Sequence, residues 1–416
     1  MSSVQGGAQE GQKAMGKPLQ GIKAVEVAMW AFVPACGGML ADLGVDIVKV
    51  EPPRGDPLRG LSIGGMGKGA IDFSWESYNR GKRSVTLDLK HEEGRAVLYR
   101  LLEDADVFLT SLLPPARRAM GIDEDAIRAR FPKLIYASGS ALGPSGPDHE
   151  KGGYDAITFW ARGGISSSLT EAEALHPVGP PGPAFGDTLS GAMLSGAICA
   201  AIAKRALTGE ASSVDVSLLG TALWSMQRYV CQATADRVQK FPKPAADKPH
   251  NVLVGTYRTS DGRFLALCML QADKYWAPFC EAAGRADLAT DPRFADAAAR
   301  RENISACYAE VTTLFASRPL AQWKDILSRQ QGQWDVVQDV GEMKDDVQAL
   351  ANGYLKHVDC QDGTQIPMVG LPMVFDGEPL ASTRSPELGA NSDAVLAGLG
   401  YSEEQIIDLK VQGVVL

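Results

Sequence analysis

The sequence predicts an α/β protein with a Rossmann-like large domain and a smaller α+β domain. From Gly21 onward, short apolar runs alternate with stretches of helical spacing, which is typical of a parallel sheet covered by helices. A polar linker at 240–250 then precedes a segment that alternates as a β-hairpin. The chain has 416 residues, more than the roughly 100 to 200 of one domain, which also favours two packed units.

Four buried strands and three helices are predicted in the first part of the large domain. The strands are expected at 22–27, 46–50, 106–110 and 134–138, and the helices at 34–43, 92–103 and 124–130. Pro34 suits the first turn of its helix, because its missing amide hydrogen is not needed there. No G-x-G-x-x-G follows the first strand, which disfavours a nicotinamide-dependent dehydrogenase.

Irregular segments and further elements complete the predicted organisation. The Pro- and Gly-rich segments 142–153 and 178–186 interrupt regular structure and are predicted to form a site wall. A small-residue helix is expected at 191–207, a strand at 215–219 and a hairpin at 254–269. The predicted parts are a flexible arm at 1–18, a large domain at 19–225, a linker at 226–250, a small domain at 251–335, a linker and return segment at 336–383, and a C-terminal segment at 384–416 that packs on the large domain.

Composition indicates a soluble cytoplasmic protein. The net charge of -9 disfavours a nucleic-acid surface. The seven cysteines include no C-x-x-C pair and the five histidines show no ligand spacing, so neither a metal site nor a tightly bound cofactor is expected. No apolar run reaches the roughly 18 residues of a membrane span, and the Gly-, Ser- and Gln-rich N-terminus lacks a signal-peptide core.

A series of short segments within residues 19–400 carries a family resemblance. They are Leu19-Gln20-Gly21-Ile22-Lys23, Ala41-Asp42-Leu43-Gly44, Lys49-Val50-Glu51-Pro52-Pro53, Gly55-Asp56-Pro57-Leu58-Arg59, Asn79-Arg80-Gly81-Lys82-Arg83, Leu87-Asp88-Leu89-Lys90, Gly153-Tyr154-Asp155, Gly186-Asp187 and Thr208-Gly209-Glu210. In this order they resemble the class III coenzyme A transferases, a family that includes formyl-CoA transferase, carnitine CoA-transferase and the α-methylacyl-CoA racemases. The resemblance implies a homodimer of two interlocked rings.

The same resemblance implies a coenzyme A thioester as substrate, with an acyl-CoA and a small carboxylic acid as partners. The coenzyme-contact positions that it implies are Arg54, Arg59, Leu87, Lys90, Ser111, Leu112 and Ser140. Coenzyme A carries several phosphate charges, so the basic groups near predicted strand ends suit it, Arg80, Lys82 and Arg83 among them.

Transferases of this family resemble one another in using an aspartate of a Gly-rich loop to attack the thioester. The matching loop here, 163–173, contains no aspartate. Counting from Gly163 places Glu173 at that position, with Glu171 close by, and a glutamate carboxylate is capable of the same attack. The resemblance therefore implies Glu173 as nucleophile with Asp187 in support. The alternative is that both glutamates are solvated loop acids.

Two further hypotheses remain open. The racemase branch resembles a Gly-His-Asp plus Gly-Asp pairing, but Tyr154 stands at the histidine position, and a phenol with a pKa near 10 is a poor base. Racemase-like isomerisation, or acyl-CoA binding without transfer, is therefore the second hypothesis. Asp155 is a catalytic candidate whose position also suits a cap of the following helix. Ala31, where formyl-type members carry glutamine, indicates an acid larger and less polar than formate or oxalate.

Overall fold

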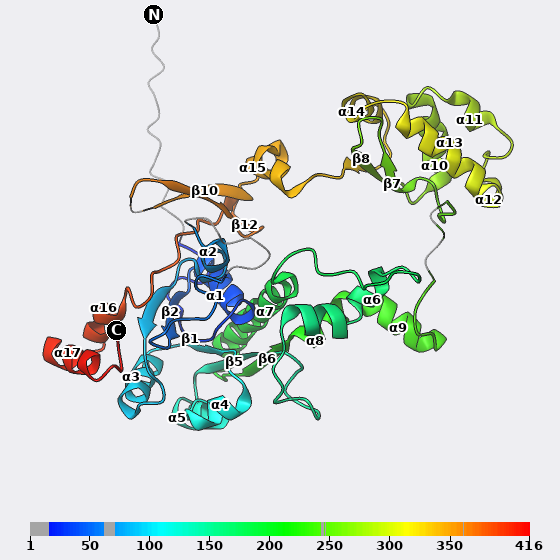
Figure 1. Cartoon of the computed structure of the whole chain (residues 1–416). Coiled ribbons are helices and arrows are strands. Elements are labelled where there is room, and N and C mark those ends of the chain that lie inside the picture. Colours follow the sequence, from blue (N-terminus) through cyan, green and yellow to red (C-terminus); the bar gives the residue numbers. More distant parts are fainter. Residues whose placement is uncertain (1–15, 62–70, 243–244, 246, 361) are drawn as a thin grey trace, which may run out of the picture. The chain divides into compact units, whose positions relative to one another are not determined.

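The computed structural model describes residues 16–61, 71–242, 245, 247–360 and 362–416 (Figure 1). These residues divide into two compact units. The larger unit comprises Met1–Gln239 with Val347–Leu416, and the smaller unit is Lys240–Asp346. Most of the predicted flexible arm, residues 1–15, lies outside the described residues.

The larger unit is built on a six-stranded parallel sheet with the strand order β3-β2-β1-β4-β5-β6. Its strands are β1 (Lys23–Val27), β2 (Asp46–Glu51), β3 (Arg83–Thr86), β4 (Val107–Thr110), β5 (Ile135–Ser140) and β6 (Ser213–Ser217). Central β1 pairs on one side with β2, where Val25 meets Val48, and on the other with β4, where Val25 meets Phe108. The order reverses between β1 and β4, and open α/β sheets bind ligands at such a switch point.

Two helices cross on one face of this sheet. They are α1 (Phe32–Asp42) and α7 (Phe185–Thr208), and their buried side chains pack with Ala24, Ile47 and Leu109 of the strands. A Cβ on Gly191 of α7 would lie 2.9 Å from the carbonyl oxygen of Phe32, so only glycine permits this crossing. By length and hydropathy α7 passes as a membrane span among the described residues, but its contact with α1 identifies it as a core helix.

The opposite face packs on a second group of helices, which includes the C-terminal ones. Val48, Val85 and Phe108 of the strands share a core with buried side chains of these helices. They are α3 (Glu92–Glu103), α5 (Glu124–Arg130), α16 (Ser392–Gly398) and α17 (Glu403–Val411). Because both faces are covered, β2 and β4 are buried along almost their whole length, as expected of a parallel sheet.

Short helices and hairpins fill the connections of the larger unit. The helices are α2 (Phe73–Asn79), α4 (Pro114–Ala119), the π-helix η1 (Ala156–Arg162), α6 (Ile165–Leu169), α8 (Leu218–Ser225), α9 (Gln227–Asp236) and α15 (Val347–Ala351). Two hairpins lie after α15, the first formed by β10 (Leu355–Asp359) and β11 (Gln365–Val369) and the second by β12 (Val374–Phe375) and β13 (Glu378–Pro379).

The smaller unit is an antiparallel sheet of β7 (Val254–Arg258), β8 (Phe264–Cys268) and β9 (Trp334–Val336), with five helices and one 3₁₀ turn. The helices are α10 (Ala272–Ala282), α11 (Ala286–Thr290), α12 (Ala297–Glu302), α13 (Ile304–Ala316) and α14 (Leu320–Leu327), and the turn is η2 (Val340–Asp345). Its core is aromatic, with Phe315 stacked on Tyr257 and close to Trp323. The predicted hairpin is confirmed as β7 and β8.

The predicted strands of the first part are confirmed as β1, β2, β4 and β5, and the predicted helices as α1, α3 and α5. Three elements of this part were missed, namely α2, β3 and α4, because each is short, and β3 has only four residues. Helix α7 begins at Phe185, six residues before the predicted start at 191, since the Pro-rich segment ends at Pro183. The strand predicted at 215–219 lies at 213–217, because Ser217 caps α8.

Candidate active site

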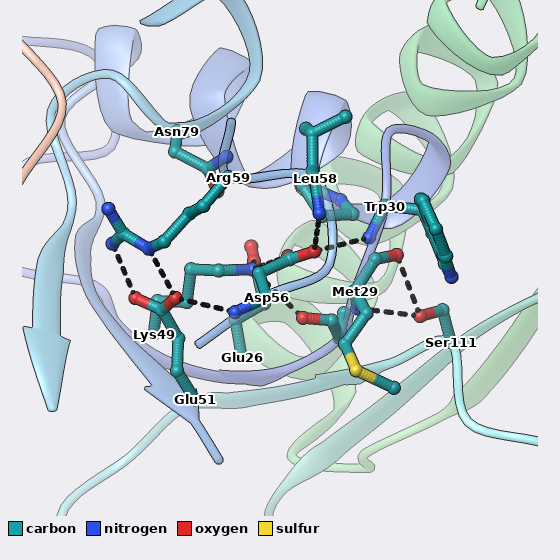
Figure 2. Close-up of polar contacts among 12 residues, drawn as sticks. Glu26, Met29, Trp30, Lys49, Glu51, Asp56, Leu58, Arg59, Asn79 and Ser111 are labelled. Atoms are coloured by element: carbon teal, nitrogen blue, oxygen red, sulfur yellow. Dashed lines mark hydrogen bonds and ion pairs between the residues drawn. The ribbon is translucent and has the colours of Figure 1, made fainter. Parts of the chain in front are cut away.

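The switch point of the sheet is fastened by a serine. The backbone amide of Met29, just after β1, donates to Oγ of Ser111 at 3.0 Å, and this hydroxyl donates back to the carbonyl oxygen of Met29 at 3.3 Å (Figure 2). Ser111 directly follows β4. The turn between β1 and α1 is therefore fixed to the end of the neighbouring strand, at the edge where this type of sheet binds ligands.

Trp30, the next residue, has an unusual backbone conformation. Its φ of 69° lies in the left-handed region, which is strained for a bulky side chain. Its amide donates to Oδ1 of Asp56 at 3.1 Å, and the same oxygen accepts from the amide of Leu58 at 3.0 Å (Figure 2). Asp56 is only 2% exposed, so it holds Trp30 from inside the protein.

Asp56 belongs to a buried ionic network of three carboxylates and three cations. Nζ of Lys49 lies 3.0 Å from Asp56 and 3.1 Å from Glu26, and Nζ of Lys82 lies 2.8 Å from Glu26. Arg59 donates twice to Glu51, both at 2.8 Å (Figure 2). Burial lowers the pKa of Lys82 to about 8, although Glu26 opposes this. The three positive and three negative charges cancel, so the network has no surplus charge. We interpret it as a structural support for the ligand-binding edge of the sheet.

Asp155 and Asp187 lie near each other at the amino end of α7. A Cβ on Gly186 would lie 2.6 Å from Oδ1 of Asp155, which shows how closely that carboxylate approaches the helix. Burial raises the pKa of Asp155, although the nearby amides of Phe185 and Gly186 act to lower it. Burial and then the charge of Asp155 raise the pKa of Asp187 to about 7. Near neutral pH Asp187 is therefore able to accept or donate a proton.

The expectation that the Asp155 side chain caps the following helix was wrong. Asp155 begins η1, but its side chain makes no capping hydrogen bond. Its carboxylate turns instead toward the amino end of α7, where the helix dipole favours negative charge and the missing side chain of Gly186 leaves room. Oδ1 has no hydrogen bond of good geometry within the described part of the chain. It is a buried acceptor facing the candidate site.

The two candidate nucleophiles lie on the exposed loop between α6 and α7. Glu171 and Glu173 are both exposed. The loop is closed at its far end, where the carbonyl oxygen of Val178 accepts hydrogen bonds from Nε1 of Trp160 and Oγ of Ser166, both at 2.7 Å. The structure brings together the two aspartates and leaves the glutamates on a separate, accessible loop.

The amino acid sequence matches the model of CoA-transferase family III over residues 19–392, about nine tenths of the chain. This chain belongs to CoA-transferase family III. Enzymes of this family move coenzyme A between carboxylic acids and use coenzyme A thioesters as substrates.

Known members of CoA-transferase family III align with the chain over almost its full length. The chain is 31% identical to the (R)-2-hydroxy-4-methylpentanoate CoA-transferase of Clostridioides difficile, over 95% of this chain and 99% of that enzyme. It is 30% identical to the cinnamoyl-CoA:phenyllactate CoA-transferase of Clostridium sporogenes, over 94% of this chain and 95% of that enzyme. A crystal structure of a CAIB/BAIF family protein from Brucella suis superposes with a TM-score of 0.80, at 28% identity, and covers 92% of this chain and all of that one.

Within the family III fold of this chain, the basic residues expected near strand ends fall into two groups. Arg80 is buried against Asp42 at 2.7 Å, and Lys82 lies in the ionic network. Arg83 pairs with Asp46 at the amino edge of the sheet, away from the switch point. Carboxylates of the protein therefore engage all three cations, and their role in phosphate binding stays a prediction. Arg54, after β2, and Lys90, before α3, are exposed and remain coenzyme candidates.

The residues at the other implied coenzyme-contact positions make contacts within the protein. Arg59 lies between Glu51 and the Trp75 ring, 3.5 Å from the ring centre. Leu87 is 1% exposed in the core, and its amide donates to the carbonyl oxygen of Glu51. Leu112 is half-buried beside Ser111, and its amide donates to Thr110. Ser140 donates to Asp215 at 3.1 Å and accepts from the amide of Gly143, and it thereby ties β5 to β6.

Three site residues were missed in the sequence, namely Trp30, Asp56 and Tyr78. Asp56 was noted only as part of a family segment, and its contact with Trp30 joins positions 26 residues apart. Tyr78, at the end of α2, has a pKa raised by burial and by the nearby Asp187 and Asp155 carboxylates. The signal available in the sequence was the position of Trp30, three residues after the first strand, where a bulky residue lies in the turn before the next helix.

The site is not enclosed by the described residues of the larger unit. Tyr154 is 58% and Ile157 59% exposed, and both lie within two residues of Asp155 in the chain. A cavity of about 390 Å³ lies in the smaller unit beside Lys274 and Arg300, and one of about 190 Å³ lies at the amino edge of the sheet beside Lys23 and Asp46. Neither is lined by the residues of the switch point.

Proposed function

We propose that this enzyme transfers coenzyme A from an acyl-CoA to a small carboxylic acid through Glu173. A carboxylate oxygen of Glu173 attacks the thioester carbon, the carbon–sulfur bond breaks, and a mixed anhydride and coenzyme A thiolate form. The thiolate then attacks the glutamyl carbonyl, which releases the donor acid and leaves an enzyme thioester. The acceptor acid repeats these steps in reverse order and leaves as the new acyl-CoA.

The observation that carries this proposal is the contrast between the loop glutamates and the buried aspartates. A carboxylate must be ionised and accessible to attack, and Glu173 lies on an exposed loop. Asp187 has a pKa raised to about 7, so much of it is protonated near neutral pH and is a poor nucleophile. A protonated carboxyl group is instead a hydrogen-bond donor, which suits support of the oxyanion that forms during the attack.

We propose that two copies of the chain form the interlocked homodimer and that the second copy covers the open site. Leu189 and Met193 on α7, together with Trp224 on α8 and Tyr229 on α9, expose between 39% and 59% of their surface. Apolar patches of this kind mark interaction surfaces in soluble proteins. A covered site would also exclude water, which protects an anhydride from hydrolysis. The expected location of this enzyme is the cytoplasm.

Chemical trapping tests the role of Glu173. The enzyme is incubated with an acyl-CoA donor and then treated with hydroxylamine or borohydride, and the modified residue is located by peptide mass spectrometry. We expect the label on Glu173 and its loss in Glu173→Gln. Glu171→Gln identifies which loop acid acts, and Glu210→Gln, an exposed glutamate after α7, is the matched control that keeps the label. Full activity in both Glu171→Gln and Glu173→Gln would end the proposal.

A second activity is favoured by the aspartate pair itself. Two carboxylates with raised pKa values are suited to exchange a proton on the carbon next to a thioester carbonyl. Incubation of a 2-methylacyl-CoA in deuterium oxide tests this. Uptake of deuterium that Asp187→Asn abolishes, without any trapped carboxylate in the loop, would support isomerisation over transfer.

A further inference from the structure

Two aromatic rings at the switch point take no part in the chemistry proposed above. The rings of Trp30 and Tyr154 meet edge to face, with centroids 5.6 Å apart and planes at 89°. Trp30 follows β1, and Tyr154 directly precedes Asp155, so the contact joins the turn after the central strand to the segment that carries Asp155. Tyr154 is 58% exposed, which leaves a face of the pair open to a ligand.

The direction of the indole is set by the backbone beneath it. A bulky residue avoids the left-handed region unless its surroundings hold it there, and such strain gathers at functional sites. Here Asp56 holds the amide of Trp30 at 3.1 Å, and Lys49 holds Asp56 at 3.0 Å. Figure 2 shows the Trp30 side chain directed away from this network. The backbone that carries the ring is therefore held by the protein itself.

The ionic network next to Trp30 carries no surplus positive charge. Beside Asp155, Phe185 adds an apolar surface, because it is 44% exposed and packs edge to face on Trp160. The three cations beneath Trp30 are each engaged by a buried carboxylate. A dianionic acid would place its second carboxylate against aromatic faces, which carry negative charge, with no cation of the network left to pair with it.

We propose that Trp30 and Tyr154 form the binding site for the side chain of the acid, and that the substrates carry an aromatic ring or a branched alkyl group. In this site Trp30 and Tyr154 determine specificity, and Asp56 is a positioning residue. The inference rests on the proposed function for the location of the thioester. The test measures binding alone, so its result can contradict this inference whether or not transfer proceeds through Glu173.

Calorimetric titration with unreactive coenzyme A thioethers tests the site in the full chain. The probes are S-(3-phenylpropyl)-CoA and S-(3-carboxypropyl)-CoA, which differ at the end of the side chain. We expect the wild type to bind the phenyl probe at least about tenfold more tightly, a preference of the size that aromatic contacts give. Trp30→Ala and Tyr154→Ala should each remove most of this ratio, whereas Trp30→Phe and Tyr154→Phe should keep it. Phe264→Ala, an exposed aromatic of the smaller unit, is the matched control.

Trp30→Gly separates the ring from the backbone strain. Glycine adopts a positive φ freely, so this variant should fold at least as well as Trp30→Ala and lose the same preference. Equal affinity of the two probes in the wild type would overturn the inference. If both alanine variants keep the wild-type ratio of phenyl-probe to carboxyl-probe affinity, the inference is also overturned. This holds even if the variants change the oligomeric state. Failure to trap Glu173 while the ratio shifts as expected would count against the proposed function alone.

Discussion

Oδ1 of Asp56 accepts a hydrogen bond from the backbone amide of Trp30 at 3.1 Å, and this contact joins a buried ionic network to the ligand-binding edge of the sheet. The network connects β1, β2 and the segment after β2 through Glu26, Lys49 and Glu51. A switch point is formed by two diverging connections, so its shape depends on what holds them. In this enzyme charged groups inside the protein hold one connection, and Ser111 fastens it to the end of β4.

Asp56→Asn should destabilise the larger unit strongly. Asparagine keeps an acceptor for the amide of Trp30, but it removes the charge that faces Lys49. A buried ion pair that loses one partner typically costs about 3–5 kcal/mol. We expect a lower melting temperature in differential scanning calorimetry. Asp46→Asn is the matched control, because its exposed pair with Arg83 is worth at most about 1 kcal/mol. Equal effects of the two changes would show that the network is not a support.

Gly191→Ala should weaken the crossing of α1 and α7. The added methyl group would meet the carbonyl oxygen of Phe32 and the Cβ of Ala35, both at 2.9 Å, and backbone atoms do not move aside easily. Overpacking of this kind costs about 1–3 kcal/mol. Gly196→Ala, on the same helix, meets nothing within 4 Å and should raise stability slightly through helix propensity. Thermal melting of the two variants should therefore shift in opposite directions.

Asp187→Asn should stabilise the protein at alkaline pH and have little effect in acid. The pKa of Asp187 is raised to about 7 in the folded state, so the folded state binds this proton more tightly than the unfolded state does. The stability from this group is complete below pH of about 4 and is lost as pH rises through about 7. Asparagine avoids that loss. We expect a melting temperature higher by roughly 2–4 °C at pH 8 than the wild type. A wild type that is the more stable of the two at pH 8 would refute the buried-pair description.

Met193→Glu should disrupt the proposed homodimer. Met193 is 43% exposed on α7, and a charge there would have to be buried when a second copy covers this face. Sedimentation velocity should show a dimer for the wild type and a monomer, or an expanded distribution, for the variant. Val411→Glu on α17, where the side chain is 82% exposed, should leave the dimer intact. A monomeric wild type at micromolar concentration would remove the basis of the covered site.

Much of the sheet could be predicted because its strands are locally encoded. Runs such as those at 22–27 and 46–50 are apolar over most of their length, since both faces of the sheet are covered. The hairpin at 254–269 was marked by Ser260-Asp261-Gly262 in the same local way. Strand β3 was missed because its four residues are recognisable only by their pairing with β2.

The site was harder to predict because its charged side chains pair with residues that are distant in the sequence. Basic residues such as Arg59 and Lys82 are suitable phosphate ligands by type, but carboxylates from other strands engage them. The side chain of Asp155 turns away from its own helix to Gly186, which lies 31 positions later. The left-handed conformation of Trp30 is likewise imposed by a contact 26 residues away. None of these pairings follows from local spacing.

Transfer of heavy oxygen tests the central claim most directly. In this measurement the acceptor acid carries the heavy isotope in both carboxylate oxygens, and the enzyme is examined by peptide mass spectrometry after turnover. Attack of that acid on an enzyme thioester leaves one heavy oxygen in the enzyme carboxylate, because the bridging oxygen stays there when coenzyme A departs with the new acyl group. In a single turnover, with the enzyme in excess over the acyl-CoA donor, we predict the isotope in Glu173 and none in the donor acid that is released, because that acid leaves before the heavy oxygen enters the enzyme. Heavy oxygen in the released donor acid, with Glu173 unlabelled, would show that the two acids react directly and would contradict the account.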